Sequence, residues 1–327
     1  MKAKIKKVHE VKGVQQKISE LILGTAFYNF DQQDIWFDIA DEYLASGGNT
    51  LDTAYHYNDS EKVVGKWMSS RAKRQDVVIV TKGAHITDEI SAKEFDRIIK
   101  KEFSASLENL ATDYIDIYML HRDIPSVPVE AFIDSMNELL DAGKIKSFGA
   151  SNWDYTRIDR ANEYARQQSM ETFAVVSNNL SLAVPLEPFY EGLLSAHGEG
   201  EQWHSKRTDT PLISWSSGAR GFFAGIITPQ MRDSIETITD SFIVRMLEVY
   251  GSDENFQRLK RAEELAKSKG EYSAVQMAIA WALARPFPAI PIVGPRTKQE
   301  LLSCIEAASI NLTESELAWL NLASDEK

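Results

Sequence analysis

The sequence predicts a (β/α)8 TIM barrel that spans residues 1–327 as a single domain. Short β-rich apolar runs alternate with amphipathic stretches eight times along the chain. Successive units of this kind form a parallel sheet with right-handed crossovers, and eight units are enough to close the sheet into a barrel. The hydrophobic fraction of 43% supports a substantial buried core, and barrels of this length are common as one domain.

The expected strands are short runs rich in apolar and β-branched residues. Val77–Thr81 is typical, because a continuous β-branched run suits a strand that is covered on both faces of a parallel sheet. By the same reasoning the strands are expected at residues 21–24, 49–52, 77–81, 114–120, 146–150, 173–176, 212–215 and 289–293.

The stretches between the strands carry apolar residues at helical spacing. The first has Ile35 to Leu44 on one face and ends at Gly47, and Ser60 is the expected N-cap of the second. Further helices are expected at residues 91–110, 129–142, 155–168, 253–269, 272–285 and 298–308. Residues 184–210 and 222–250 are expected to be loop insertions, and a capping box at Thr313 opens a C-terminal helix and tail over 313–327.

An open doubly wound sheet is the alternative fold. Such sheets usually bind dinucleotides through G-x-G-x-x-G after the first strand. Here the first strand continues into Gly24-Thr25-Ala26-Phe27-Tyr28, and the fingerprint is absent from the whole chain. The sequence therefore favours the closed barrel.

Composition limits the partners and the compartment. The net charge of −12 argues against nucleic acid, which requires clustered Lys and Arg. The single cysteine, Cys304, cannot form an internal disulfide, which is typical of a reducing cytoplasm. The basic residues 1–7 are not followed by an apolar region, and no apolar run reaches spanning length, so we expect neither a secretory signal nor a membrane segment.

Polar residues recur where the expected strands end. In a (β/α)8 barrel all strand C-termini open onto one face, which carries the active site, so residues distant in sequence converge there. The residues in question are Asp52, Lys82, His121, Ser151, Asn152, Trp215 and Arg296.

Four of the residues near these ends make a proton-donating group. A free phenol such as Tyr57 has a pKa of ~10, and a nearby ammonium such as Lys82 is expected to lower it. Asp52 would pair with Lys82, and His121 would orient a carbonyl oxygen or share the proton donation. The group contains no nucleophile, so it suits a reaction in which a cofactor supplies the hydride.

Simpler interpretations exist for each residue alone. Asp52 is a possible cap, Lys82 a solvated strand end, His121 a structural histidine and Tyr57 a packed aromatic residue. Their joint placement at successive strand ends favours the functional interpretation. Asp52, His56, Glu61 and His121 can also be drawn as the metal ligands of a barrel hydrolase, but no H-x-H or H-E-x-x-H pair supports that site.

Several motifs together resemble the aldo-keto reductase superfamily. Residues 49–65 resemble the family signature around its catalytic Asp and Tyr, and residues 79–82 are similar to the strand that carries its lysine. Residues 114–121 resemble the strand that bears its histidine, and residues 143–153 match a further signature. The resemblance extends from Leu21 to about Leu320, and the loop Trp215–Phe223 resembles a bacterial branch of the family.

The resemblance implies an NADPH-dependent oxidoreductase that reversibly reduces an aldehyde or ketone to an alcohol. Tyr57 would be the general acid, tuned by Lys82 and Asp52, with His121 orienting the carbonyl. Residues 1–20 would form a β-hairpin that closes the barrel bottom. No metal is implied.

The resemblance also implies a cofactor site. Ser151 and Asn152 would bind the nicotinamide carboxamide, and Trp215 would stack on the ring. Arg296 would meet the 2′-phosphate, which favours NADPH, although NADH remains possible. The loop over the pyrophosphate would comprise Ser216, Ser217, Gly218, Ala219 and Arg220, and the remaining cofactor contacts would be Gly24, Thr25, Ser177, Gly294 and Glu300.

The chain departs from the family pattern at two cofactor positions. A glutamine often follows the sixth strand, but Ser177 stands there with Asn178 and Asn179 beside it, and any of the three is a candidate for that contact. Cys304 occupies the place of an adenine-binding asparagine.

Substrate contacts are expected from loops at the same face. Aromatic residues would form an apolar wall, and Asn29 and His85 would bind hydroxyls, which suits sugars, hydroxy-ketones or simple aldehydes. The full set is Phe27, Tyr28, Asn29, His85 and Trp153. Two other functions remain open: a cofactor-binding regulatory subunit, like the potassium-channel-associated members of the superfamily, and a metal-dependent hydrolase. The sequence does not predict an oligomeric state.

Overall fold

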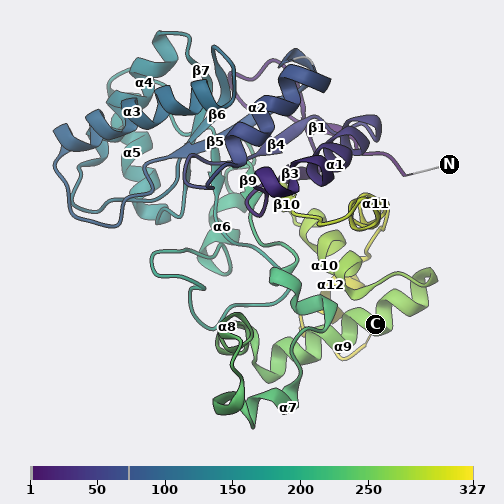
Figure 1. The fold of residues 1–327 in the computed structure, drawn as a ribbon. Coiled ribbons are helices and arrows are strands. Elements are labelled where there is room, and N and C mark those ends of the chain that lie inside the picture. The colour runs from purple at the N-terminus through teal and green to yellow at the C-terminus, as the bar shows by residue number, and fades with distance from the viewer. Residues whose placement is uncertain (1–2, 73, 327) are drawn as a thin grey trace.

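Parallel strands close into a barrel in the order β10–β3–β4–β5–β6–β7–β8–β9 (Figure 1). The structure is a computed structural model that describes residues 3–72 and 74–326; residues 1–2 of the expected hairpin and residue 327 of the expected tail lie outside them. Because the sheet returns to its first strand, the predicted (β/α)8 barrel is confirmed as a single domain, and the open doubly wound sheet is excluded.

The barrel strands are short, and each is hydrogen-bonded to its sequence neighbour in the ring. Asp52 of β4 stands opposite Val80 of β5, and Lys82 of β5 opposite Met119 of β6, so these three strand ends adjoin. The strands are β3 (Ile22–Gly24), β4 (Thr50–Asp52), β5 (Val78–Gly83), β6 (Ile115–Leu120), β7 (Ile145–Ser151), β8 (Val175–Ser177), β9 (Leu212–Ser214) and β10 (Ala289–Val293).

An antiparallel pair, β1 (Lys7–His9) and β2 (Ile18–Ser19), precedes the barrel and confirms the predicted hairpin. Val11 and Ile18 from this region pack on apolar side chains that fill the barrel interior, among them Ile22, Val80 and Ile117. The hairpin therefore closes the end of the barrel opposite the strand C-termini.

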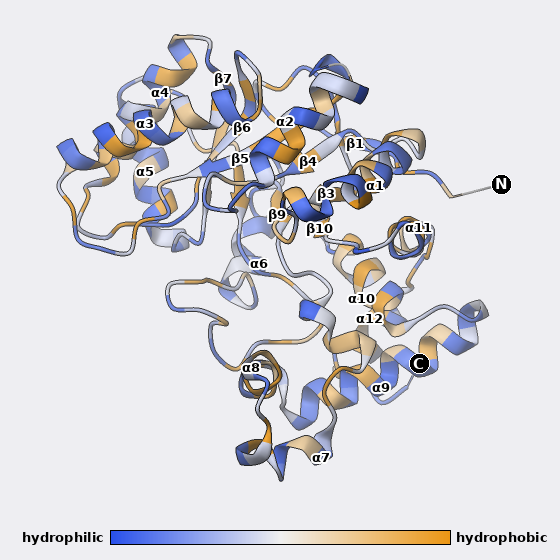
Figure 2. Ribbon diagram, in the orientation of Figure 1, coloured by the Kyte–Doolittle hydropathy of each residue, from blue (hydrophilic) through white to orange (hydrophobic). Residues whose placement is uncertain are grey.

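Helices surround the strands. Ser91, Asp154 and Ser273 accept hydrogen bonds from backbone N–H groups of the first turns that follow them, as N-caps do. Figure 2 shows hydrophobic and hydrophilic residues alternating around many of these helices, as helices with one buried face require. The helices are α1 (Gln33–Ala45), α2 (Ser60–Arg71), α3 (Ala92–Asn109), α4 (Val129–Asp141), α5 (Tyr155–Gln167), α9 (Asp253–Gly270), α10 (Ala274–Leu283), α11 (Lys298–Ala307) and α12 (Glu314–Leu320).

The two expected loop insertions contain helices that the sequence analysis does not predict. Residues 184–210 include α6 (Glu199–Ser205), and residues 222–250 include α7 (Pro229–Arg232) and α8 (Ser241–Tyr250). Asp240 caps α8 by accepting hydrogen bonds from the N–H groups of Phe242 and Ile243, and α8 buries Met246 and Tyr250. Short 3-10 turns, η1 (Phe30–Gln32), η2 (Arg74–Asp76), η3 (Ala219–Ala224) and η4 (Ile235–Thr237), complete the chain.

Within the described residues, every helix is too short or too polar to cross a membrane.

Candidate active site

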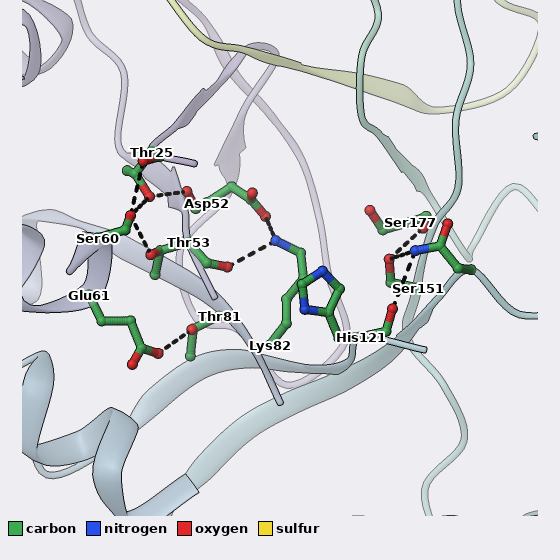
Figure 3. Close-up of polar contacts among 11 residues, drawn as sticks. Thr25, Asp52, Thr53, Ser60, Glu61, Thr81, Lys82, His121, Ser151 and Ser177 are labelled. Carbon is green, nitrogen blue, oxygen red and sulfur yellow. Dashed lines mark hydrogen bonds and ion pairs between the residues drawn. The ribbon is translucent and has the colours of Figure 1, made fainter. Parts of the chain in front are cut away.

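A buried ion pair joins the ends of β4 and β5. The Lys82 ammonium donates to Asp52 Oδ2 at 2.6 Å and to the Thr53 carbonyl at 2.9 Å (Figure 3). Both side chains are almost fully buried. Burial acts to lower the pKa of Lys82, but the charges of Asp52 and Tyr57 act in the opposite direction and outweigh it, so the pKa is raised. Lys82 is therefore a fixed cation at neutral pH.

Tyr57 lies in the turn between β4 and α2 with its ring beside Lys82. The Lys82 Nζ is 5.1 Å from the centroid of the Tyr57 ring. The sequence predicts that Lys82 lowers the pKa of the Tyr57 phenol. Lys82 does act in that direction, but the prediction is wrong for the pKa as a whole, which is raised. Burial raises the pKa of Tyr57 by more than Lys82 lowers it. The phenol therefore keeps its proton at neutral pH, which leaves it available for donation.

His121 directly follows β6 and completes the group. Its ring centroid lies 5.5 Å from that of Tyr57, nearly perpendicular to it, and its Nδ1 atom is buried with no hydrogen-bond partner. Burial, and then the charge of Lys82, hold the pKa of His121 well below its usual value. A neutral imidazole therefore faces the phenol, as a carbonyl-orienting group requires.

A second polar cluster adjoins this group and includes residues that the sequence analysis missed. The rings of His56 and His85 stack 3.8 Å apart, and Arg122 Nε donates to His85 Nε2 at 3.1 Å. His85 was predicted as a substrate contact, whereas His56 was considered only as a metal ligand and Arg122 not at all. Their positions in the sequence indicate all three residues. His56 precedes Tyr57, His85 lies just after the end of β5, and Arg122 follows His121.

The ends of β7 and β8 bring Ser151, Asn152 and Ser177 together. Ser151 Oγ donates to the Ser177 carbonyl at 2.8 Å, and Asn152 Nδ2 donates to Ser151 Oγ at 3.1 Å. The Ser177 hydroxyl is buried without a partner. The amide nitrogens of Asn178 and Asn179 instead donate to the carbonyls of Trp153 and Trp215. Of the three candidates, only Ser177 has its whole polar side chain available.

The loop after β9 has an unusual backbone. Ser216, Ala219 and Arg220 have φ angles of 53°, 49° and 53°, in the left-handed region that non-glycine residues avoid. The Ser217 hydroxyl donates to the Ser214 carbonyl at 3.0 Å and holds the start of the loop. Gly218 and the half-buried ring of Trp215 belong to the same loop, and the indole Nε1 has no partner.

The Arg220 side chain of this loop lies over an aromatic ring. Its guanidinium carbon is 4.2 Å from the centroid of Phe189 and 5.5 Å from that of Tyr190, and its Nε is buried without a partner. Burial lowers the pKa of Arg220, and Tyr57 is among the groups that oppose this shift. Arg220 therefore places positive charge at the mouth of the barrel.

The ends of β3 and β10 adjoin in the barrel. Gly24 is required there because a Cβ atom would lie 2.7 Å from the Ile292 side chain, and Thr25 Oγ1 donates to the Asp52 carbonyl at 2.9 Å. Arg296 is exposed near the start of α11, and its backbone N–H donates to Glu300 Oε2 at 2.7 Å. Gly294 is exposed, with Phe27 beside it.

The other four predicted substrate contacts make contacts within the protein, and their role toward a substrate stays a prediction. Trp153 is fully buried against Phe132 and Phe173, because its side chain points into the layer between the barrel and its helices. The Tyr28 hydroxyl donates to the Pro295 carbonyl, and burial raises the pKa of Tyr28 to about 12.

The other two, Asn29 and Phe27, belong to the same loop as Tyr28. Asn29 caps η1 by accepting from the Asp31 N–H at 2.9 Å. Phe27, which is 61% exposed, has its ring 5.9 Å from the Arg296 guanidinium. The structure therefore places Phe27, Tyr28 and Asn29 on the β10 side and Trp153 in the core, and it leaves His85 beside His121.

The alternative metal-ligand set does not converge. Asp52 is occupied by Lys82, while Glu61 accepts from Thr81 Oγ1 at 2.6 Å and from Asn109 Nδ2 at 3.0 Å (Figure 3). Within the part of the chain that the structure describes, no group of three or more His, Cys, Asp or Glu side chains is arranged so that it could hold a metal ion. Cys304 lies on α11, and burial raises its thiol pKa to about 12.

Comparisons with known proteins agree with this geometry. The chain is 28% identical to versiconal hemiacetal acetate reductase of Aspergillus parasiticus, covering 93% of each protein. It is 27% identical to aldo-keto reductase str7 of Strobilurus tenacellus, over 95% of this chain and 90% of the relative. The solved structure of glycerol dehydrogenase AKR11B4 from Gluconobacter oxydans shares the fold, with a TM-score of 0.74 at 20% identity over 96% of this chain and 94% of that one.

The family description "Aldo/keto reductase family" matches residues 20–324, which is nearly the whole chain. Relatives named as reductases and dehydrogenases agree with an enzyme of oxidation and reduction. The chain belongs to the aldo/keto reductase family.

Proposed function

We propose that this enzyme reduces an aldehyde or ketone to an alcohol, reversibly, with NADPH as the hydride donor and Tyr57 as the proton donor. One observation carries the proposal: the buried Asp52–Lys82 pair lies beside a protonated phenol and a neutral imidazole. Family membership supports the oxidoreductase class.

The residues present fit a nicotinamide cofactor. The buried Ser177 hydroxyl and the Trp215 indole N–H have no hydrogen-bond partner among the described residues, and the left-handed loop that follows Trp215 carries Arg220. Unpaired buried polar groups are costly unless a ligand completes them. Ser151, Asn152, Ser177 and Trp215 would hold the nicotinamide, residues 216–220 the diphosphate, and Gly24, Thr25, Gly294, Arg296 and Glu300 the adenosine half.

The chemistry divides between cofactor and protein. The cofactor, when bound, supplies a hydride to the carbonyl carbon. Tyr57 donates its phenol proton to the carbonyl oxygen, and the Lys82 ammonium stabilises the phenolate that remains. Asp52 holds Lys82 in place. His121, which is neutral, hydrogen-bonds the carbonyl oxygen and fixes its distance from Tyr57.

We propose NADPH rather than NADH because of Arg296. Its exposed guanidinium stands near the start of α11, where the positive charge of the side chain and the positive end of the helix dipole both favour a phosphate. Arg296→Ala should weaken NADPH binding and leave NADH binding nearly unchanged. Equal losses for both cofactors would contradict this assignment.

The substrate we propose is a small carbonyl compound. One relative, at 28% identity, is named versiconal hemiacetal acetate reductase, which supports the reduction of a carbonyl compound or its hemiacetal. The single cysteine supports a cytoplasmic location as part of the same proposal.

The test is a cofactor-oxidation screen over aldehydes, ketones and sugars with NADPH and with NADH. The Tyr57→Phe variant, which keeps the ring and loses the proton, is the matched control. We expect NADPH consumption by the wild type and a near-complete loss in the variant. Tight NADPH binding without consumption across the screen would instead support the regulatory-subunit interpretation.

A further inference from the structure

Three imidazoles and one guanidinium gather beside the catalytic group. The His56 and His85 rings stack nearly parallel, 3.8 Å apart at an interplanar angle of 5°. The His121 ring stands edge-on to both, at 4.9 Å from His85 and 6.5 Å from His56. Arg122, the next residue after His121, donates from Nε to His85 Nε2 at 3.1 Å. The proposed mechanism uses only His121 of these four.

The position of His85 is held from several sides. The preceding residue, Ala84, has a left-handed φ of 59°, and its N–H donates to Glu102 Oε2 at 2.6 Å. Arg122 in turn donates to the carbonyl of Glu191, and a Cβ atom at Gly192 would lie 2.6 Å from its Nη1. A backbone held out of its preferred region by surrounding contacts is typical of functional sites.

These contacts decide which imidazole is available to a ligand. Because His85 Nε2 accepts from Arg122, the neutral ring must carry its proton on Nδ1, and burial lowers the pKa of His85 to about 4. His85 is therefore a fixed, uncharged platform. His56 stacks on that platform, is exposed, and has no hydrogen-bond partner for its ring nitrogens within the described residues.

We propose that His56 determines substrate specificity by binding a hydroxyl group next to the substrate carbonyl, with Arg122 and Glu102 as positioning residues that act through His85. This inference rests on the proposed function. A carbonyl oxygen held by Tyr57 and His121 leaves the adjacent carbon of the substrate facing His56, whose ring lies 6.5 Å from that of His121. The expected substrates are α-hydroxy aldehydes and ketones, including sugars.

The hydrogen-bonding capacity of the His56 ring suits a hydroxyl group at this position. The Arg122 guanidinium is directed at His85 and at the Glu191 carbonyl, and Glu102 lies close enough to His56 to attract positive charge. An imidazole both donates and accepts hydrogen bonds, as a hydroxyl does.

The test compares two three-carbon aldehydes, glyceraldehyde and propanal, which differ by their hydroxyl groups. His56→Phe keeps a flat ring for stacking and removes both ring nitrogens. We expect KM for glyceraldehyde to rise roughly three- to tenfold, as the loss of one neutral hydrogen bond implies. KM for propanal and kcat for both aldehydes should change less than about twofold.

Arg122→Ala tests the positioning role. It should raise KM for glyceraldehyde as His56→Phe does, and the double variant should add little, because both changes remove one interaction. Arg166→Ala, which removes an exposed arginine on α5, is the matched control and should change neither KM.

The outcomes separate the two proposals. If neither aldehyde is reduced by the wild type with either cofactor, and the broader screen is also negative, the proposed function fails. If both aldehydes are reduced but His56→Phe changes the two KM values equally, or lowers activity only toward glyoxylate as a carboxylate probe, the specificity role of His56 is wrong.

Discussion

The ends of β4–β6 and the ends of β8 and β9 open onto the same mouth, yet their polar groups are satisfied to different degrees. On the first side, Lys82 is bonded to Asp52 and Thr53. On the second side, Ser177 and Arg220 keep buried polar atoms without partners, and the loop backbone is left-handed. The Asp52–Lys82 pair is satisfied within the protein, although His121 Nδ1 beside it is also buried without a partner, whereas the side proposed for the cofactor keeps several such atoms.

The difference has a physical basis. An ion pair with fixed geometry must exist before substrate arrives, because its role is to set the charge around Tyr57. Groups that bind a cofactor gain nothing from an internal partner, since that partner would have to be displaced. The left-handed residues of the loop cost of order 1–3 kcal/mol each, and the packing around them must hold them in place.

The largest expected effect is on catalysis by the completed side. Tyr57→Phe should lower kcat by about 10²- to 10⁴-fold, the range typical of a lost general acid. The dissociation constant for NADPH, measured by fluorescence titration, should change less than about twofold, because Tyr57 belongs to the other side. A comparable loss of cofactor affinity would mean that the two sides do not work separately.

The second effect is on stability. Lys82→Met should lower the free energy of unfolding by about 3–5 kcal/mol, because it leaves the buried Asp52 carboxylate without its partner. Urea unfolding measures this. Asp52→Leu in the same chain should restore most of the loss by removing the unpaired charge. Failure of the double variant to recover would show that the pair stabilises the fold in its own right.

The third effect tests the cofactor side. Arg220→Ala should weaken NADPH binding by about 10- to 100-fold, since a charged hydrogen bond to phosphate contributes about 1.5–3 kcal/mol. Stability without cofactor should change little, because the contacts that Arg220 would lose among the described residues are those with the rings of Phe189 and Tyr190. Arg232→Ala, an arginine of α7 paired with Asp253, is the control and should leave affinity unchanged. If Arg220→Ala instead lowers the stability and leaves the NADPH affinity unchanged, Arg220 serves to pack the loop and not to bind the cofactor.

The fourth prediction concerns His204 of α6, in the insertion after β8. Its Nε2 is buried without a partner, and burial lowers its pKa to about 4. The pKa of His204 is lower in the folded protein than in the unfolded chain. The neutral histidine therefore makes its full contribution to folding stability above about pH 6.5, and this contribution is lost as the pH falls toward 4. By pH 5 this loss is at most about 2 kcal/mol.

His204→Asn retains a donor near the Thr210 carbonyl and cannot take up a proton. Its free energy of unfolding should therefore fall less than that of the wild type between pH 7 and pH 5. Parallel pH curves for the two proteins would remove His204 as a source of acid sensitivity.

The barrel and the convergence of the proposed catalytic residues could both be predicted from the positions of the strands in the sequence. Strand periodicity places Asp52, Lys82 and His121 at strand ends, and barrel closure brings those ends to one mouth. Sequence reasoning did not predict the direction of the Tyr57 pKa, which depends on how burial compares with the field of Lys82. That balance exists only once the surrounding chain is packed.

The substrate contacts stay a prediction, because a position after a strand does not decide where a side chain points. Trp153 is the second residue after β7 and still packs outward against Phe132. The contact of Arg122 with His85 joins residues 37 positions apart in the sequence, and no local pattern indicates it. The α8 helix was missed within a segment whose other parts are irregular.

The smallest expected effects are those of removing two serine hydroxyls, Ser151 of β7 and Ser177 of β8. They give the sharpest comparison because the two strands are neighbours in the barrel. Ser177→Ala removes a hydroxyl that has no partner, so stability should stay the same or rise slightly, while NADPH affinity falls about three- to tenfold. Ser151→Ala removes a hydroxyl that donates to the Ser177 carbonyl and accepts from Asn152, so it should cost about 1 kcal/mol of stability as well. Thermal unfolding and cofactor titration on both variants decide the matter. If Ser177→Ala destabilises the protein and leaves NADPH affinity unchanged, its hydroxyl has a role within the fold and the cofactor side is as complete as the catalytic one.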